Sequence, residues 1–258
     1  MVDPINKKVK SWIKTEWESP YLNNIKHFLK NENSFNNFKH HKSYTAIVET
    51  VNKKMGGEYL KATVNNHPYL IDYFDKFKTN DKYGNPNIFP YDNYGKWSPT
   101  TLRYIHVLSQ LIHFFGDLND FKIVEIGGGY GGQCKIIKDY FNIKEYIIYD
   151  LDDVSKLQNK YLNKFNLSDF RTKSYTKIEN EKNIDLVISN WALSELHPNI
   201  QEEYIKNILN NSKSGFLIWN YSKKSYSPVE MIKKIKGSSI IKYSFGIYKN
   251  LKTIIIKW

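Results

Sequence analysis

The 258-residue sequence contains a single cysteine, Cys134, so an internal disulfide bond is excluded. It has no run of about eighteen apolar residues, which is the length that a transmembrane helix needs. The first eight residues lack the apolar core of a signal peptide. These absences predict a cytoplasmic protein that is held together by packing alone. The hydrophobic content of 41% is sufficient for a substantial core.

Arginine is also scarce. Arg103 and Arg171 are the only two, so lysine supplies the other 36 of the 38 basic residues behind the net charge of +12. Arginine is the residue that binds phosphate and guanine through two parallel hydrogen bonds, so this charge is weak evidence for nucleic-acid binding, and we do not expect a nucleic-acid partner. A positive surface still favours an anionic partner, such as a nucleotide-linked sugar, an acidic glycan or a membrane face.

Glycines gather in one stretch, Phe121–Gln133, where an apolar run ends in Gly127, Gly129 and Gly131 and an amphipathic segment follows. This pattern predicts a buried strand, a tight turn and a helix that begins at the turn. Glycine permits positive φ and lets a ligand approach bare backbone amides. A second apolar run ends in Asp150, about twenty residues further on, where a carboxylate can bind the hydroxyls of a ribose.

The glycine spacing distinguishes two classes of ligand. A dinucleotide site usually carries G-x-G-x-x-G, whereas the spacing here is E-x-G-x-G-x-G, beginning at Glu125. S-adenosylmethionine (SAM) has no phosphate and carries a sulfonium and an amino-acid tail. An acid at Glu125 suits this cationic end better than it suits a diphosphate. The pattern resembles motif I of the class I SAM-dependent methyltransferases, and SAM is the cofactor that it implies.

From Phe121 onward, apolar runs typical of strands alternate with segments typical of helices. Strands are expected at 121–126, 145–149, about 170–175, 184–189 and 215–219, with two closing strands at about 238–245 and 251–258. This alternation predicts an α/β fold with a Rossmann-like, doubly wound seven-stranded sheet. The short turn between the last two strands predicts an antiparallel C-terminal hairpin, which class I methyltransferases have and dehydrogenases lack.

The preceding part of the chain has a different pattern. We expect residues 1–97 to form a helical N-terminal extension with a substrate-side loop, and residues 98–258 to form the methyltransferase domain. Within the extension, 31–42 reads as a polar loop, and Tyr44–Met55 reads as a helix that ends at the following pair of glycines. The segment 78–95, rich in Asn, Pro and Tyr, reads as a long, ordered loop.

Five strings resemble one family more specifically. They are Thr79–Pro86, Ser98–Tyr104, Val124–Gln133, Tyr149–Leu151 and Asp185–Leu196. Together they resemble a family of sugar O-methyltransferases found in surface-polysaccharide gene sets, and the stretch they span covers over half of the chain. The resemblance implies a SAM-dependent O-methyltransferase that acts on a sugar hydroxyl, in a nucleotide-sugar or a surface glycan. It does not indicate which sugar.

The resemblance also implies cofactor contacts at the glycine turn and at the tips of neighbouring strands. The expected cofactor-binding residues are Glu125, Gly127, Gly129, Tyr130, Gly131, Asp150, Leu151, Tyr175 and Asn190. Glu125 would lie near the SAM ammonium and Asp150 would hold the ribose. Leu151 and Tyr175 would flank the adenine, although a core position is an equally open reading for Tyr175.

A sugar hydroxyl is a weak nucleophile and needs a general base within reach. The candidate catalytic residues are Glu195, which is the first choice, His197 and His106. Each has a structural alternative: a salt bridge to a lysine for Glu195, a helix cap for His197 and a packing role for His106.

The expected substrate contacts are Asp81, Asn85 and Arg103, and Arg103 could equally reach the SAM carboxylate. No cluster of histidines and acids has the spacing of metal ligands, so no metal is predicted. Two other functions stay open at this point. One is an RNA or nucleoside methyltransferase, which the net charge supports, and the other is a SAM-binding scaffold without activity.

Overall fold

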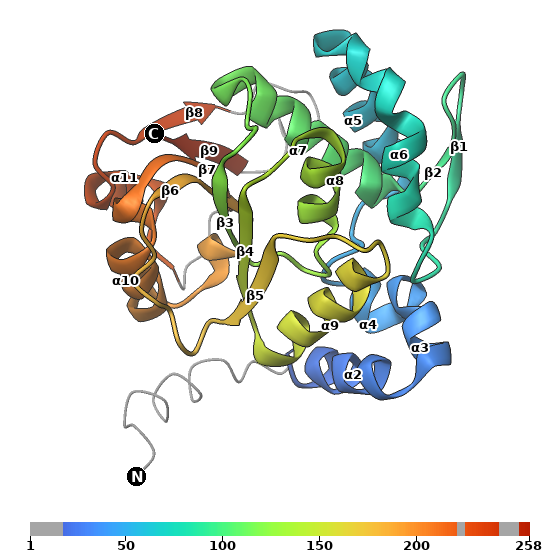
Figure 1. Ribbon diagram of the computed structural model, residues 1–258, viewed down its shortest axis with the longest axis horizontal. Coiled ribbons are helices and arrows are strands. Elements are labelled where there is room, and N and C mark those ends of the chain that lie inside the picture. The colour runs from blue at the N-terminus through green and yellow to red at the C-terminus, as the bar shows by residue number, and fades with distance from the viewer. Residues whose placement is uncertain (1–17, 221–224, 243–252) are drawn as a thin grey trace.

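A seven-stranded sheet runs through the centre of the protein (Figure 1). The computed structural model describes residues 18–220, 225–242 and 253–258. Along the sheet the strand order is β5-β4-β3-β6-β7-β9-β8. The strands are β3 (Lys122–Ile126), β4 (Glu145–Asp150), β5 (Phe170–Ser174), β6 (Ile184–Asn190), β7 (Ser212–Asn220), β8 (Ser239–Lys242) and β9 (Thr253–Lys257). The predicted α/β class and seven-stranded sheet are confirmed.

The first five of these strands are parallel, and β9 runs antiparallel to both β7 and β8. The predicted antiparallel pair at the C-terminus is therefore confirmed, whereas its expected turn, 246–250, lies outside the described residues. The chain passes from β3 outward to β5 and then returns to β6 on the other side of β3. Open α/β sheets bind ligands at such a reversal, outside the carboxyl ends of the strands.

Helices cover both faces of the sheet, as Figure 1 shows. One face packs against α7 (Pro99–Phe115), α8 (Gly132–Tyr140) and α9 (Asp152–Asn163), and the other packs against α10 (Pro198–Asn207) and α11 (Pro228–Lys234). Alternate residues of each strand point to opposite faces. In β3, accordingly, Ile123 belongs to the first apolar cluster and Val124 to the second.

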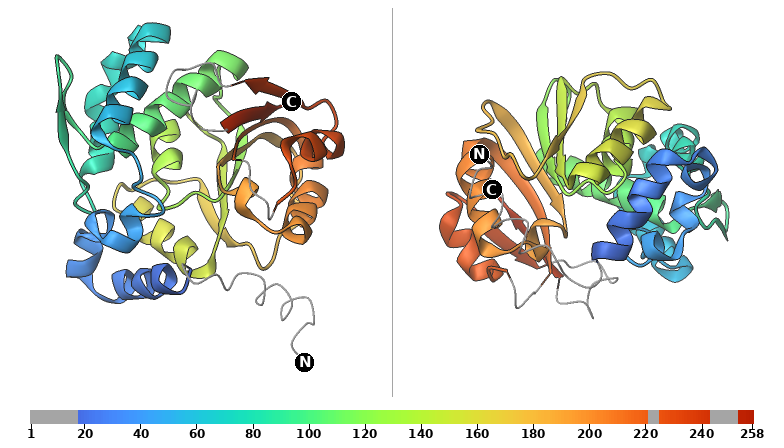
Figure 2. Two further views of the ribbon diagram at one scale, coloured as in Figure 1. Left: turned by 180° about the vertical axis from the view of Figure 1, so that it is seen from behind. Right: turned by 90° about the horizontal axis from the view of Figure 1, so that it is seen from below.

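Short helices from the first third of the chain pack on the α8–α9 side of the sheet (Figure 2). They are α2 (Glu18–Lys30), α3 (Glu32–Asn36), η1 (Phe38–His40), α4 (Lys42–Thr45), α5 (Lys53–Asn66), η2 (Pro68–Tyr73), α6 (Phe74–Lys78) and η3 (Thr79–Asp81). Helix α2 contacts α9, and α5 contacts α7. Their buried side chains join the same apolar cluster as that face of the sheet. None of the helices described is long and apolar enough to cross a bilayer.

The helix predicted over Tyr44–Met55 is wrong. Helix α4 ends at Thr45, and α5 begins at Lys53, where the Asn52 side chain accepts a hydrogen bond from the Met55 amide at 2.9 Å. Asparagine is a favoured N-cap because its side chain satisfies one of the free amides of the first turn. The glycine pair that was expected to end a helix lies inside α5 instead.

Two segments expected to be loops contain regular structure. Within 31–42, Asn31 caps α3, and buried Phe35 and Phe38 anchor the short helices to the core. Within 78–95, the chain forms η3 and then β1 (Phe89–Tyr91), which pairs antiparallel with β2 (Gly95–Trp97). The remaining elements described are the 3-10 turns η4 (Leu193–Glu195) and η5 (Leu209–Asn211).

Candidate functional site

The glycine turn, Gly127–Gly132, joins the carboxyl end of β3 to the start of α8. Gly127, Gly129 and Gly131 have φ of 77°, 58° and 91°, in the left-handed region that other residues rarely adopt. At Gly127 a Cβ would also overlap the methyl group of Ala192, so glycine is required there twice over. The Gly127 amide donates to Tyr149 O on β4 at 2.8 Å, which fixes the turn to the neighbouring strand.

Asp150 lies at the carboxyl end of β4, beside this turn. Its Oδ2 accepts hydrogen bonds from the Gly129 amide at 3.2 Å and from Gln158 Nε2 at 2.9 Å, and its Oδ1 accepts one from the Leu151 amide at 2.8 Å. Burial raises the pKa of Asp150 to about 7, and these hydrogen bonds oppose the rise. Asp150, expected at the end of the second strand, therefore contacts the glycine turn.

Glu125 lies directly under the turn, where a Cβ on Gly128 would be 3.2 Å from its Oε2. The carboxyl is buried and accepts a hydrogen bond from Tyr146 Oη at 2.9 Å. Burial raises the pKa of Glu125 to about 8. At pH 7 the group is therefore mostly neutral, and it offers little charge to a cationic ligand.

Tyr130 points its side chain away from the turn into an aromatic cluster built with the N-terminal segment. Its ring lies 5.7 Å from that of Phe38 and 4.8 Å from that of Tyr161. The ammonium of Lys39 is buried 4.1 Å from the Tyr130 ring centroid and donates to Asn80 O at 2.7 Å. The sequence prediction missed Lys39, because a lysine in a polar stretch gives no sign of burial.

Residues Tyr44–Thr50, named here the cover segment, lie over the glycine turn. Val48 Cγ1 is 3.2 Å from the position that a Cβ of Gly129 would take. Arg103, on α7, donates from Nη2 to Val48 O at 3.1 Å, and its guanidinium lies 5.1 Å from the centroid of the Trp191 ring. Arg103 thus joins the cover segment to the carboxyl end of β6. This contact was not predicted, because the segment was read as a continuous helix.

The end of β6 lies on the other side of the turn. Asn190 Nδ2 donates to Gln133 Oε1 at 3.4 Å, and Gln133 Nε2 donates to Tyr104 O at 3.2 Å. Within the described ranges, Asn190 Oδ1 is buried without a hydrogen-bond partner. On β4's far side, the Tyr175 amide donates to Asp150 O at 2.9 Å. The structure therefore brings Asn190, Asp150 and Tyr175 to one edge of the sheet, as predicted.

The three candidate bases are placed differently. His106 is fully buried, with Thr63 Oγ1 at 3.5 Å from its Nδ1, and burial lowers its pKa to about 3. His197 caps α10, and its Nδ1 accepts from the Asn199 amide at 3.3 Å. Glu195 lies in η4 with an exposed side chain, although neighbouring atoms still raise its pKa by desolvation. The two histidines thus take the structural roles that the sequence left open.

Two of the expected substrate contacts also have structural partners. Asp81 accepts hydrogen bonds from the Ser98 amide at 2.9 Å and from Thr101 Oγ1 at 2.6 Å, so it caps the start of α7. Asn85 is exposed, and its side chain donates to Asn37 Oδ1 at 2.9 Å. Arg103 alone of the three is beside the glycine turn. In the described part of the chain, no group of three histidine, cysteine or acidic residues could hold a metal ion.

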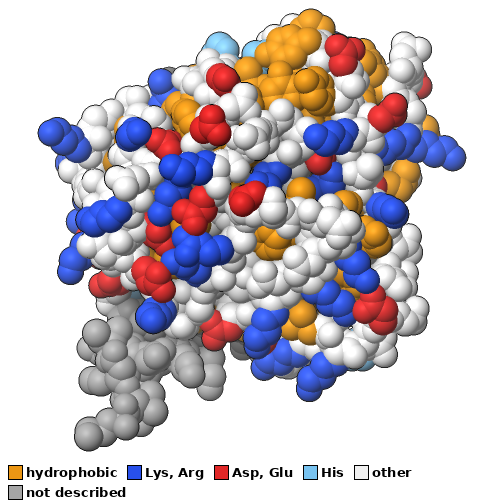
Figure 3. All heavy atoms as spheres, in the orientation of Figure 1, with side chains coloured by type: hydrophobic (Ala, Val, Ile, Leu, Met, Phe, Trp, Pro, Cys, Tyr) orange, Lys and Arg blue, Asp and Glu red, His pale blue; other side chains and the backbone are white. Residues whose placement is uncertain are grey.

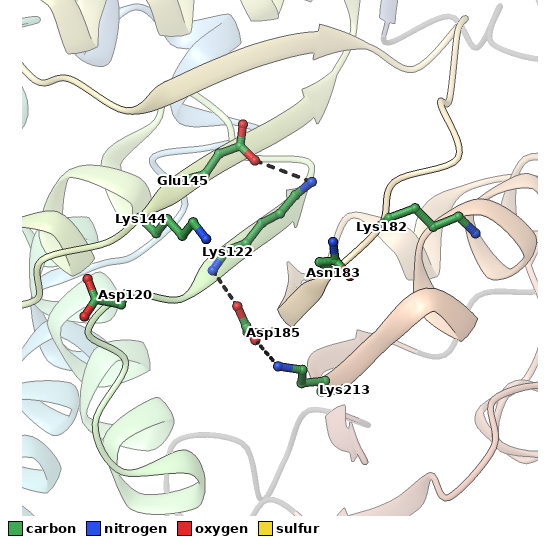
Figure 4. A pocket seen from close by; sticks show the side chains of 8 residues that line it. All are labelled: Asp120, Lys122, Lys144, Glu145, Lys182, Asn183, Asp185 and Lys213. Carbon is green, nitrogen blue, oxygen red and sulfur yellow. Dashed lines mark hydrogen bonds and ion pairs between the residues drawn. The ribbon is translucent and has the colours of Figure 1, made fainter.

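A separate depression of about 590 Å³ lies at the opposite end of the sheet, where the amino ends of several strands meet (Figure 4). Several of its charged groups pair with one another. Asp185 accepts from the Lys122 amide at 2.8 Å and from Lys213 Nζ at 2.7 Å, and Lys122 Nζ lies 3.4 Å from Glu145. Because the glycine turn is at the carboxyl ends, this depression is not part of the candidate site.

No family profile and no curated protein matches the sequence. Among solved structures, the chain is similar to part of the complex of the Haloferax volcanii Trm112 methyltransferase activator with a protein assigned as a methyltransferase (TM-score 0.45, 12% identity, 60% of this chain and 89% of that one). It is also similar to the methyltransferase domain of bacterial CtHen1 (0.45, 11%, 60% and 96%) and to YcgJ of Bacillus subtilis (0.44, 12%, 59% and 97%). These similarities extend over about 60% of the chain and give no information on a substrate.

The topology of the chain is specific in itself. Five strands are parallel, and their order along the sheet reverses between β3 and β6. An antiparallel β9 lies between β7 and β8, and a glycine turn follows β3. The protein therefore has the predicted Rossmann-like, doubly wound α/β fold of seven strands with antiparallel C-terminal strands.

Proposed function

We propose that the protein is a SAM-dependent O-methyltransferase that acts on a sugar hydroxyl, in a nucleotide-sugar or a surface glycan, in the cytoplasm. The observation that supports the cofactor is the hydrogen bond between the Gly129 amide and Asp150 at the point where the strand order reverses. The sugar part rests on the resemblance of the SPTTLRY and SNxAxSEL strings to sugar O-methyltransferases.

The residues around the turn suit SAM. The Asp150 carboxylate would take the ribose hydroxyls, and the amides of the glycine turn would lie along the donor. Leu151 and Tyr175, at the tips of neighbouring strands, would flank the adenine. When bound, SAM supplies a methyl group on a sulfonium, which leaves by in-line displacement, so the protein chiefly has to align the acceptor oxygen with it.

The acceptor hydroxyl needs a group that removes its proton as the new bond forms. Of the three candidates, His106 is buried between α5 and α7, and His197 caps α10. Glu195 follows Asn190 by one turn of chain and keeps an exposed carboxylate. We therefore propose Glu195 as the base, and residues 1–97 as the extension that completes the acceptor side of the site.

Surface charge does not favour an RNA substrate. On the face shown in Figure 3, lysines and arginines are interspersed with acidic side chains. Ion pairs of the protein include Lys173 with Glu179 at 2.6 Å and Lys213 with Asp185 at 2.7 Å. Nucleic-acid binding needs basic groups that are free to neutralise phosphates. The charge therefore does not single out RNA as the acceptor.

The decisive experiment incubates the protein with SAM and a panel of nucleotide-sugars, with short RNA as a further acceptor, and measures the mass of each by mass spectrometry. We expect a mass gain of one methyl group on at least one nucleotide-sugar. Methylation of RNA alone would replace the proposal with the RNA alternative. SAM binding without transfer to any acceptor would favour the scaffold alternative.

A further inference from the structure

The cover segment carries one acidic residue, Glu49, which is not among the site residues expected from the sequence. The preceding residue, Val48, lies over Gly129. Among the described residues, Glu49 Oε1 is buried and has no hydrogen-bond partner. Burial raises the pKa of Glu49, and the Lys39 ammonium, the Thr100 hydroxyl and the Arg103 guanidinium oppose the rise. An unpaired buried carboxylate oxygen is costly, so this atom calls for a partner that the described residues do not supply.

Arg103 has the complementary open atom. Its Nη2 donates a hydrogen bond to Val48 O at 3.1 Å, and its Nη1 lies 3.5 Å from Thr50 Oγ1. Its Nε is buried and has no hydrogen-bond partner in the described structure. The guanidinium also lies over Trp191, the residue after β6. One carboxyl and one guanidinium, each with an open atom, thus lie beside the same glycine turn.

Two more buried polar atoms near this turn lack partners within the described ranges, Tyr44 Oη and Asn190 Oδ1. Tyr44 belongs to the cover segment, and its ring is 6.4 Å from that of Tyr130 in the turn. Asn190 ends β6 and bonds to Gln133 in the first turn of α8. Native interiors leave few polar atoms unpaired, so four around one turn indicate a polar ligand.

The ligand must carry both charges. SAM has at one end an amino-acid tail with an ammonium and a carboxylate. Glu125 was expected to meet the ammonium, but its carboxyl is buried under Gly128 and accepts from Tyr146 Oη. The ammonium therefore needs another acid, and in the described part of the chain Glu49 lies next to the turn with an open carboxylate oxygen.

We propose that Glu49 binds the ammonium of the SAM amino-acid tail and that Arg103 binds its carboxylate, which rests on the proposed function. The cover segment is then part of the donor site, and its position responds to whether the tail is present. Ionic hydrogen bonds to a tail of fixed length also restrict where the sulfonium can lie.

The test compares two ligands that differ in the tail alone. S-adenosylhomocysteine carries the amino-acid tail, whereas 5′-methylthioadenosine keeps the adenosine and the sulfur but lacks the tail. Isothermal titration measures the affinity of both for the wild type, for Glu49→Gln and for Asp72→Asn, an exposed acid in η2 that serves as the matched control. Glutamine keeps the shape of Glu49 and removes its charge.

We expect Glu49→Gln to lower the affinity for S-adenosylhomocysteine by about tenfold or more and to keep the affinity for 5′-methylthioadenosine within about twofold of the wild type. Asp72→Asn should leave both affinities unchanged. If Glu49→Gln does not fold, Arg103→Lys carries the test, with the same split expected. Equal losses for the two ligands would show that Glu49 only holds the segment in place.

The outcomes separate this inference from the proposed function. If Glu49→Gln binds S-adenosylhomocysteine as tightly as the wild type does, the role of Glu49 is overturned and the SAM site stands. A wild type that binds neither ligand would overturn the SAM site itself, and the role of Glu49 with it.

Discussion

Asp150 and Gly129 are 21 positions apart, yet the Asp150 carboxylate accepts a hydrogen bond from the Gly129 amide at 3.2 Å. The contact joins the end of β4 to the turn after β3, so two adjacent parallel strands bring the carboxylate and the glycine turn together at their carboxyl ends. Gln158, on α9, bonds to both partners, to Gly129 O at 3.0 Å and to Asp150 Oδ2 at 2.9 Å. The chain's own hydrogen bonds therefore hold the Asp150 carboxylate against the glycine turn.

Replacing Asp150 by alanine should lower the affinity for S-adenosylhomocysteine by about tenfold or more, because the ribose loses a charged hydrogen-bond acceptor. The Gly129 amide and the Gln158 side chain lose the same acceptor. Isothermal titration measures the affinity, and a melting curve shows how much of the loss is structural. Equal affinities for wild type and variant would remove the ribose role.

Gly127→Ala should destabilise the protein and abolish binding of S-adenosylhomocysteine. The new methyl group would overlap Ala192, and alanine at a φ of 77° costs about 1–2 kcal/mol. The double variant Gly127→Ala with Ala192→Gly removes the overlap and keeps the strained φ, so it should recover part of the loss. Urea unfolding measures all three proteins. A double variant no more stable than the single one would show that the overlap is not the cause.

Stability should fall as the pH rises from about 5 to 8. Burial raises the pKa of Glu125 from 4.5 to about 8 and that of Asp150 from 3.8 to about 7. Between the unfolded and folded pKa the native state binds more protons than the unfolded state, so unfolding becomes easier as protons are removed. Urea unfolding across this range checks the slope.

The variant Glu125→Gln tests the same cause. Glutamine is neutral at every pH and its amide oxygen can still accept from Tyr146 Oη, so the pH slope should flatten and the variant should exceed the wild type in stability at pH 8. Asp72→Asn, on the surface, should keep the slope of the wild type. A slope unchanged in Glu125→Gln would mean that this carboxyl does not titrate with a raised pKa.

The sheet could be predicted because its signals are local. Apolar runs such as Ile123–Ile126 are dense in β-branched residues, and the glycines that follow require positive φ in the structure as well. The Asp150 contact could be predicted for the same reason, since parallel strands fix which ends meet. The cover segment could not, because its position depends on contacts with Gly129 and Arg103 that are far away in sequence.

The structural roles of the candidate bases were also beyond the sequence. His106 has helical spacing with its apolar neighbours, but whether it lines a cleft or packs against α5 depends on which helix lies beside α7. Glu125 shows the same limit from another side. Its place before the glycines was evident, whereas the hydroxyl of Tyr146 that holds it comes from the next strand.

Glu195→Gln should lower the turnover on the sugar identified by the acceptor panel by on the order of 10² or more, because glutamine cannot take the acceptor proton. Binding of S-adenosylhomocysteine should stay within about twofold of the wild type, since Glu195 lies on η4 and not on the glycine turn. Initial rates and titration measure the two quantities separately. Undiminished turnover would exclude Glu195 as the base.

The two glycines of α5 should respond to alanine in opposite directions. Alanine favours a helix interior over glycine by about 1 kcal/mol, so propensity alone predicts that both substitutions stabilise the protein. At Gly57 the new Cβ would lie 3.6 Å from the Tyr91 ring, an ordinary contact, and Gly57→Ala should gain most of that free energy. At Gly56 it would overlap Tyr91 Oη and lie 2.9 Å from Pro99 Cβ, so Gly56→Ala must push α5 away from the start of α7 and should destabilise the protein. Urea unfolding of the two variants compares them directly, and a stabilised Gly56→Ala would contradict the close packing of α5 on α7.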